Sequence, residues 1–293
     1  MRGGAGGMEY SGMTAIASML YDDWGKQIEA LSGTLGAGDL SKILGDEDLD
    51  MSTADMSTHA AGTTSKSADA TSKSADEAAS SPASDFLRDT LGSQKAMLDT
   101  IFETTIAHEV AHQWWAIGVG SDSRRAPFVD ESLTNYCAML YFEDRYGKQR
   151  AAQMTDIHLR TAYSMTRTLN LPDAPVNLST ASYKNNLQYG GIVYGKGALY
   201  YDALRREVGD AIFFASLREY YALYRDRLAA PRDLLRIVQR KAPAKSSEVA
   251  ALFARWIEQT HGDDDITGGK PASINDLLGG MLGGDLAGAA GDE

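Results

Sequence analysis

Two histidines and a glutamate stand close together in the stretch His-Glu-Val-Ala-His at residues 108–112. On an α-helix, residues four apart differ by about 40° around the axis, so His108 and His112 present their imidazoles on one face. A single metal ion can bridge that span. Glu109 follows the first histidine, and in such helices a carboxylate at this position lies beside the open coordination position of the metal, where it can take a proton from water.

A hydrolytic zinc site commonly holds three protein ligands and a water molecule, so a third ligand is required. Glu131 follows His112 after eighteen intervening residues, in a segment with a helical pattern. That spacing lets the first helix end, the chain turn, and a second helix return beside it. We therefore expect His108, His112 and Glu131 to bind one Zn²⁺ ion, with Glu109 as the general base. Taken singly, the histidines could be ordinary helix residues, and Glu131 a carboxylate favoured by a helix N-terminus.

The spacing H-E-x-x-H, eighteen residues, then E resembles the membrane alanyl aminopeptidase (aminopeptidase N) family of zinc metallopeptidases, of the gluzincin type. The Gln-Trp-Trp that follows at 113–115 strengthens the resemblance. Residues 6–10 (GGMEY) resemble the family's G-x-M-E-N motif, and residues 193–198 (VYGKGA) resemble its V-Y-x-K-G-A stretch. The resemblance covers about 1–35 and 90–266, with the motifs in the family's order.

This resemblance implies a hydrolase that releases N-terminal amino acids from peptides, a metalloprotease of the aminopeptidase kind. It assigns Glu9 to the substrate's free amino group, with Gly7 and Met8 on the strand that aligns the peptide backbone. Tyr194 would donate a hydrogen bond to the tetrahedral oxyanion. Tyr10 stands where the family has asparagine, which leaves Glu9 intact but alters a neighbouring contact.

Family members normally carry a large β-rich domain ahead of the G-x-M-E-N strand, and this chain begins almost at that strand. We therefore expect a missing domain or a partner chain to complete the substrate cleft. Three alternatives stay open. The chain could be a non-catalytic, zinc-stabilised module that binds a peptide or partner, or a fragment active only with the missing domain. Endopeptidase action on the same apparatus is a third possibility.

The elements that must position these residues are mostly helical. The fold class we predict is mostly α with a small early β portion (α+β), a thermolysin-like zinc peptidase catalytic domain. Residues 1–35 form a strand-containing start, 36–90 a low-complexity, disordered insertion, 91–266 the helical catalytic domain and 267–293 a weakly ordered Gly-rich tail. One strand is expected at 7–16. The glycines at 190 and 191 are expected to lie in a loop. Helical patterns cover 93–117, 128–146, 148–169, 195–208, 210–226, 231–240 and 246–260.

Composition narrows the classes of function. The 293 residues are 43% hydrophobic and 23% charged, which is a globular composition. The formal charge is −12 and no local basic patch is present, so the chain would repel a phosphate backbone. Nucleic-acid binding is therefore not expected. No stretch approaches eighteen consecutive apolar residues, and no apolar run of leader length follows the start, so neither a membrane span nor a signal peptide is expected.

Three further residues are predicted to lack a chemical role. Cys137 lies in a helical apolar pattern and is expected to be a small buried hydrophobe. Lys196, within the V-Y-x-K-G-A stretch, is expected to be a solvated or helix-start cation. His158 has no metal-ligand neighbour at helical spacing and is expected to be a plain surface or helix-end residue.

Overall fold

The computed structural model describes residues 7–10, 13–16 and 98–269. The predicted insertion at 36–90 lies outside the described residues, as does most of the predicted tail at 267–293. The domain boundaries drawn from the sequence therefore stay predictions.

The amino-terminal described residues form a β-hairpin. Strand β1 (Gly7–Tyr10) pairs antiparallel with strand β2 (Met13–Ile16), and Tyr10 lies opposite Met13 in the register. The sequence predicted one continuous strand here, and that expectation is wrong. Ser-Gly at 11–12 lies outside the described residues, but as a dipeptide that is frequent in turns it was a sequence signal against one continuous strand.

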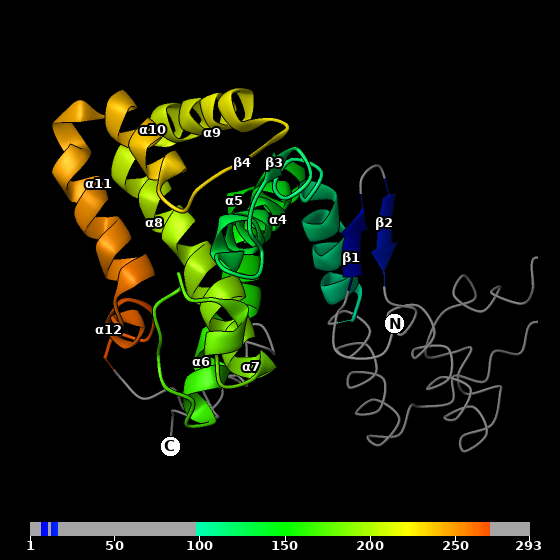
Figure 1. The fold of residues 1–293 in the computed structure, drawn as a ribbon. Helices are drawn as coiled ribbons and strands as arrows, with labels where there is room; N and C mark the ends of the chain where they lie inside the picture. The colour runs from blue at the N-terminus through cyan, green and yellow to red at the C-terminus, as the bar shows by residue number, and fades with distance from the viewer. Residues whose placement is uncertain (1–6, 11–12, 17–97, 270–293) are drawn as a thin grey trace, which may run out of the picture. The chain divides into compact units, whose positions relative to one another are not determined.

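The remaining described chain is a layered arrangement of helices (Figure 1). It opens with helical residues 98–111, which carry most of the histidine motif. A short parallel pair, β3 (Val119–Gly120) with β4 (Arg227–Leu228), joins two distant loops. The helices are η1 (Pro127–Val129), α4 (Glu131–Tyr146), α5 (Lys148–Met154), η2 (Thr155–Arg160), α6 (Thr161–Thr168), η3 (Thr180–Ser182), α7 (Asn186–Tyr189), η4 (Gly190–Lys196), α8 (Gly197–Val208), α9 (Asp210–Tyr224), α10 (Asp233–Lys241), η5 (Pro243–Lys245), α11 (Ser246–Phe253), η6 (Ala254–Glu258) and α12 (Gly262–Ile266).

Three of the helical runs contain a π-helical stretch, namely η2, η4 and η6. The run α7–η4–α8 passes straight through Gly190 and Gly191, so the predicted loop there is wrong. The reason is close packing. A Cβ at Gly191 would lie 1.9 Å from Thr166 Oγ1 and 2.8 Å from the carbonyl oxygen of Ala162, so the residue must lack a side chain for η4 to lie against α6.

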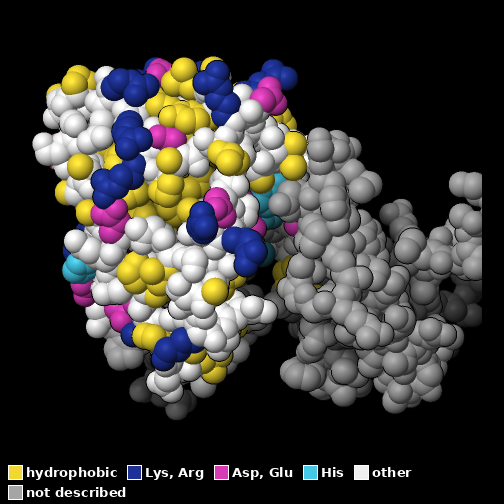
Figure 2. All heavy atoms as spheres, in the orientation of Figure 1, with side chains coloured by type: hydrophobic (Ala, Val, Ile, Leu, Met, Phe, Trp, Pro, Cys, Tyr) yellow, Lys and Arg dark blue, Asp and Glu magenta, His cyan; other side chains and the backbone are white. Residues whose placement is uncertain are grey.

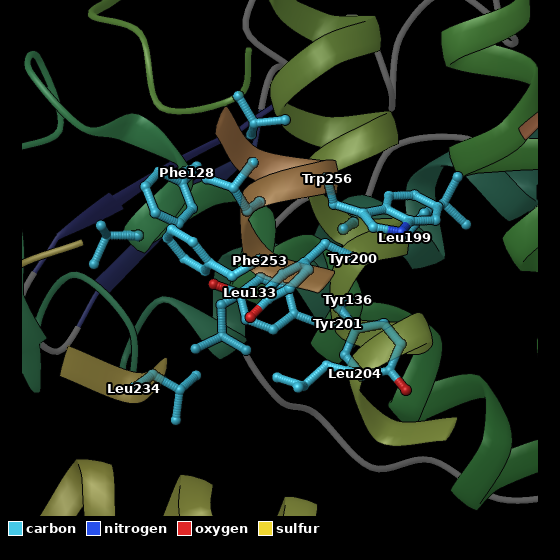
Figure 3. Close-up of a cluster of buried hydrophobic side chains, with 14 of the residues drawn as sticks. Phe128, Leu133, Tyr136, Leu199, Tyr200, Tyr201, Leu204, Leu234, Phe253 and Trp256 are labelled. Atoms are coloured by element: carbon cyan, nitrogen blue, oxygen red, sulfur yellow. The ribbon is translucent and has the colours of Figure 1, made fainter. Parts of the chain in front are cut away.

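Helix α8 is at the centre of the core, with α4, α9 and α11 packed around it. Its aromatic and aliphatic side chains share one buried cluster with side chains of η1, α4, α10, α11 and η6 (Figure 3). Leu133 of α4 and Leu199 and Leu204 of α8 are almost completely buried, and burial of each contributes about 1.5–3 kcal/mol. The labelled members of this cluster are Phe128, Leu133, Tyr136, Leu199, Tyr200, Tyr201, Leu204, Leu234, Phe253 and Trp256.

The predicted fold class, mostly α with a small early β portion, is confirmed for the described residues. None of the described helices combines the length and the apolar character needed to cross a bilayer. On the face seen in Figure 2, basic and acidic side chains lie intermixed. Ion pairs such as Arg167–Asp263, with 2.7 Å between Nε and Oδ1, join basic and acidic side chains within the described residues.

Candidate metal centre and active site

The first two candidate ligands lie at the end of helical residues 98–111. The sequence predicted this helix to reach residue 117, and it ends six residues earlier. Ala116 adopts a positive φ of 113°, and its N–H donates to Val119 O at 3.0 Å, which closes a tight turn. His112 stays in register because its N–H donates to His108 O at 3.2 Å. Both imidazoles are buried.

The third candidate ligand, Glu131, is the first residue of α4. The preceding Asp130 caps that helix, since its carboxylate accepts from the Glu131 N–H at 2.8 Å. The same carboxylate accepts from Ser121 Oγ at 2.6 Å and from Ser123 Oγ at 2.5 Å. Burial raises the pKa of Asp130, and these serine bonds oppose the rise. The loop before α4 is therefore held against the start of the helix, which fixes the position of Glu131.

The three side chains converge on one point. The two imidazole Nε2 atoms lie 3.0 Å apart, and each lies 3.3 Å from Glu131 Oε2. Among the described residues, His108, His112 and Glu131 are the one group of three or more potential ligands that could hold a metal ion. The structure thus brings together the three residues that the sequence predicted as ligands.

The donor set suits zinc. His112 Nδ1 lies 2.8 Å from Trp115 O and donates its proton there, which leaves the Nε2 lone pair facing the other two donors. Burial raises the pKa of Glu131, but hydrogen bonds and charge from the two histidines outweigh burial and hold it below its usual range. The carboxylate is therefore ionised, as a metal ligand must be. Ligands at zinc distances on a tetrahedron lie about 3.3 Å apart, which matches the observed separations.

Tyr194 lies in η4 beside this group. Its ring stacks on the His108 ring, with centroids 5.6 Å apart and planes 29° apart. A second ring, Tyr189, meets it edge-on at 5.6 Å. Burial first, and then the charge of Glu131, raise the pKa of Tyr194 well above its ordinary value. The phenol therefore keeps its proton and can act as a hydrogen-bond donor.

Of the other predicted site residues, Glu109 is described with its side chain, whereas Gly7, Met8 and Glu9 are described only as part of a strand. Glu109 is 5% exposed and follows His108 within the helix. Gly7, Met8 and Glu9 lie in β1. The side chains of that strand lie outside the described part of the chain, so their role in substrate binding stays a prediction.

The Peptidase family M1 domain matches residues 83–256, which is more than half of the chain. The chain belongs to peptidase family M1. The resemblance seen in the sequence motifs is thereby confirmed at the level of the family.

Relatives of this M1 chain are longer. Aminopeptidase N of Lactococcus lactis subsp. lactis is 25% identical over 157 residues, which cover 53% of this chain and 18% of that protein. The M1 zinc metallopeptidase of Deinococcus radiodurans is 24% identical, with a TM-score of 0.42, over 54% of this chain and 33% of that one. A mutant of the latter, bound to a Tyr-Ser-Ala substrate, matches with the same values. The M1 chain thus spans about a fifth of the length of the curated relative.

Sequence reasoning missed the residues that orient His112 in the M1 chain. Its acceptor, the Trp115 carbonyl, also lies 3.4 Å from Thr134 Oγ1 on α4. The Trp115 indole Nε1 donates to Cys137 Sγ at 3.1 Å. This contact joins the turn after helical residues 98–111 to α4. Burial raises the pKa of Cys137 to about 12, so it stays a thiol. Cys137 therefore has a structural partner beyond the hydrophobic role predicted for it.

Two expectations for the M1 chain hold only in part. Lys196 was expected to be a solvated or helix-start cation. It directly precedes α8, but it is 1% exposed, and its Nζ lies 3.0 Å from both carboxylate oxygens of Asp173. His158 was expected to be a plain surface or helix-end residue. It lies in the last turn of η2, but it is half-buried, and its Nε2 lies 3.1 Å from Thr104 Oγ1. Thr104 is one turn before His108, so His158 holds the helix of residues 98–111 in place through this contact. Neither contact has a local sequence signal, because each joins residues more than twenty positions apart.

Proposed function

We propose that this chain is a zinc-dependent metallopeptidase that hydrolyses peptide bonds and releases N-terminal amino acids from peptides. The observation that carries the proposal is the convergence of His108 Nε2, His112 Nε2 and Glu131 Oε2 within 3.0–3.3 Å of one another. In this proposal the three residues hold one Zn²⁺ ion. Family membership supports the choice of zinc and of peptide hydrolysis.

Zinc, when bound, supplies Lewis-acid polarisation of a carbonyl and lowers the pKa of a coordinated water to about 7. Glu109 acts as the general base, and its carboxylate accepts a proton from the attacking water. It then passes this proton to the departing amine, so one side chain serves both steps. Its burial excludes bulk water, which suits a proton carrier in a poorly hydrated cleft.

Tyr194 donates a hydrogen bond from its phenol to the oxyanion that develops on the scissile carbonyl. The raised pKa of Tyr194 supports this role, because only a protonated phenol can donate. A donor already fixed in place needs no reorganisation as charge develops, and its loss costs about 2–4 kcal/mol of transition-state stabilisation.

Glu9 binds the free amino group of the substrate, and Gly7 and Met8 align the peptide backbone along β1. The preferred substrate is thus a peptide with a free first residue. We also propose that a further domain or a partner chain completes the cleft, since this chain covers only 18% of the aminopeptidase N relative.

The test compares hydrolysis of one peptide with a free and with an acetylated N-terminus, each with and without a zinc chelator. We expect chelator-sensitive release of the first residue from the free peptide only. Equal cleavage of both peptides would contradict the amine-anchoring role of Glu9. A zinc-loaded protein that cleaves neither peptide, alone or within a longer polypeptide that supplies the domain proposed to complete the cleft, would contradict the enzymatic proposal and favour a binding module.

A further inference from the structure

Two side chains of α4 hold the backbone of the tyrosine-bearing segment. Ser132 Oγ donates to the carbonyl of Val193 at 2.6 Å, and Asn135 Nδ2 donates to the carbonyl of Tyr194 at 2.7 Å. Asn135 lies one helical turn after Glu131. A single turn of α4 therefore carries both the acidic candidate ligand and the amide that holds Tyr194.

The opposite side of η4 is in close contact with its neighbours. A Cβ at Gly195 would lie 2.8 Å from Leu159 O and 3.2 Å from Tyr163 N, both backbone atoms. Gly197, just after η4, has equally little room, since a Cβ there would lie 2.2 Å from Ser132 Oγ. The segment thus lies between α4 and the run that contains η2 and α6.

The end of η4 is anchored by Lys196. Besides the Asp173 carboxylate, its Nζ donates to Ala174 O at 3.1 Å and Gln259 O at 2.9 Å. Asp173 in turn accepts from the Gly262 N–H at 2.9 Å. These anchors act two residues beyond Tyr194. The bond to the carbonyl of Tyr194 itself comes from Asn135.

The identity of residue 135 is hard to explain by helix stability alone. Asparagine is a poorer helix former than alanine or leucine, because its short amide competes for backbone hydrogen bonds. Asn135 is only 9% exposed, and a buried amide costs free energy unless it is hydrogen-bonded. The bond to Tyr194 offsets that cost.

We propose that Asn135 is a positioning residue that fixes the backbone of Tyr194, and so keeps its phenol in place beside His108 and Glu131. This inference rests on the proposed function of Tyr194 as the oxyanion donor. Asn135 itself does not touch the substrate. Its effect passes through the tyrosine hydroxyl, and this dependence can be measured.

The experiment is a double-mutant cycle in the full 293-residue chain loaded with zinc. Tyr194→Phe should lower kcat about 100-fold. Asn135→Ala should lower kcat about 10- to 100-fold, with KM and zinc content unchanged, since a misplaced group slows the chemical step. The double variant should be no slower than Tyr194→Phe alone, because position is irrelevant once the hydroxyl is gone. Losses that multiply would show a general structural role and overturn the proposal.

Two further variants serve as a replacement for the alanine variant and as a matched control. Asn135→Leu keeps the same branched arrangement of heavy atoms without the donor, and it replaces the alanine variant if that one fails to fold. Gln239→Ala is the matched control, because Gln239 Nε2 also donates from a helix to a backbone carbonyl, that of Ser246, at 3.2 Å. This bond joins α10 and α11 rather than α4 and η4. We expect Gln239→Ala to leave kcat unchanged, and an equal loss in it would overturn the specific role of Asn135.

A second readout does not depend on turnover. With 3-fluorotyrosine in place of Tyr194, the ¹⁹F resonance reports the surroundings of the phenol. Asn135→Ala should shift or broaden that resonance, and Gln239→Ala should not. An unchanged ¹⁹F signal would overturn the positioning role, even if the wild-type chain proves to lack peptidase activity, a result that would overturn only the proposed function.

Discussion

His108 and His112 face each other because residues four apart share one face of a helix, and this geometry is readable from sequence. The eighteen-residue spacing made Glu131 the natural third ligand, and its oxygen lies 3.3 Å from both imidazoles. The sequence does not predict the side-chain contacts that hold these residues in place. The contact between Asn135 and Tyr194 joins residues 59 positions apart, and the one between Trp115 and Cys137 joins residues 22 apart. Such pairings depend on how the helices pack.

The role of Glu109 gives a prediction at this scale. Glu109→Gln should retain zinc, because Glu109 is not among the three converging donors, and should lower kcat about 100- to 10,000-fold, the usual contribution of general acid–base catalysis. The measurement is turnover of an aminoacyl reporter, paired with metal analysis. Glu103→Gln is a matched control on the same helix, where Glu103 accepts from the hydroxyls of Tyr141 and Tyr146. Wild-type turnover in Glu109→Gln would remove it from the base role.

At the scale of elements, most helices were predictable within a few residues, because their apolar faces repeat at helical spacing. The central run α7–η4–α8 was the exception. Glycine is a poor helix former, so Gly190 and Gly191 indicated a loop. In the structure Gly191 permits the close approach of η4 to α6, a tertiary requirement that has no local pattern.

Two glycines of this run should respond in opposite directions to alanine. Gly195→Ala should lower the free energy of unfolding by about 1–3 kcal/mol, because its Cβ would meet backbone atoms that cannot move independently. Gly190 has helical angles (φ −58°, ψ −52°), and no atom lies within 4 Å of the place that a Cβ would take, so Gly190→Ala should raise that energy by up to about 1 kcal/mol. Urea denaturation with chelator present measures both. Equal effects would contradict the packing explanation.

At the scale of the whole molecule, buried polar contacts join segments that are distant in sequence. Lys196 and Asp173 connect η4 to the chain around α12, and His158 connects η2 to the ligand helix. Apolar periodicity predicted a helical chain, but Lys196 was expected to be a solvated or helix-start cation and His158 a surface or helix-end residue, so their burial was not anticipated. Lysine is usually exposed and histidine is intermediate in burial, so the buried place of either residue depends on partners that are distant in sequence.

Acid should destabilise the fold partly through His158. Burial, with a smaller effect of Arg150, lowers the pKa of His158 to about 4, below the unfolded value of about 6.5. A lowered pKa means that this residue stabilises the fold above about pH 6.5, and that the stabilisation is lost as pH falls towards 4. The loss should be about 1–3 kcal/mol.

His158→Gln keeps a donor for Thr104 and cannot titrate, so its free energy of unfolding should fall less between about pH 7 and pH 4. Urea denaturation of both proteins, with chelator present, provides the comparison. The two proteins differ only at residue 158, so the difference between their pH dependences isolates the contribution of His158. Identical pH dependence would show that His158 is not held neutral by the fold.

Every proposed role in catalysis depends on one zinc ion held by two imidazoles and one carboxylate. Metal analysis of the purified chain, paired with X-ray absorption at the zinc edge, examines that ion without reference to activity. We expect about one zinc ion per chain with two imidazole nitrogens at about 2.0–2.1 Å, and strongly reduced zinc in a Glu131→Ala variant that keeps its helical circular dichroism. A wild-type chain that stays metal-free in zinc-containing buffer, or a Glu131→Ala variant that binds zinc as fully as the wild type, would refute this site.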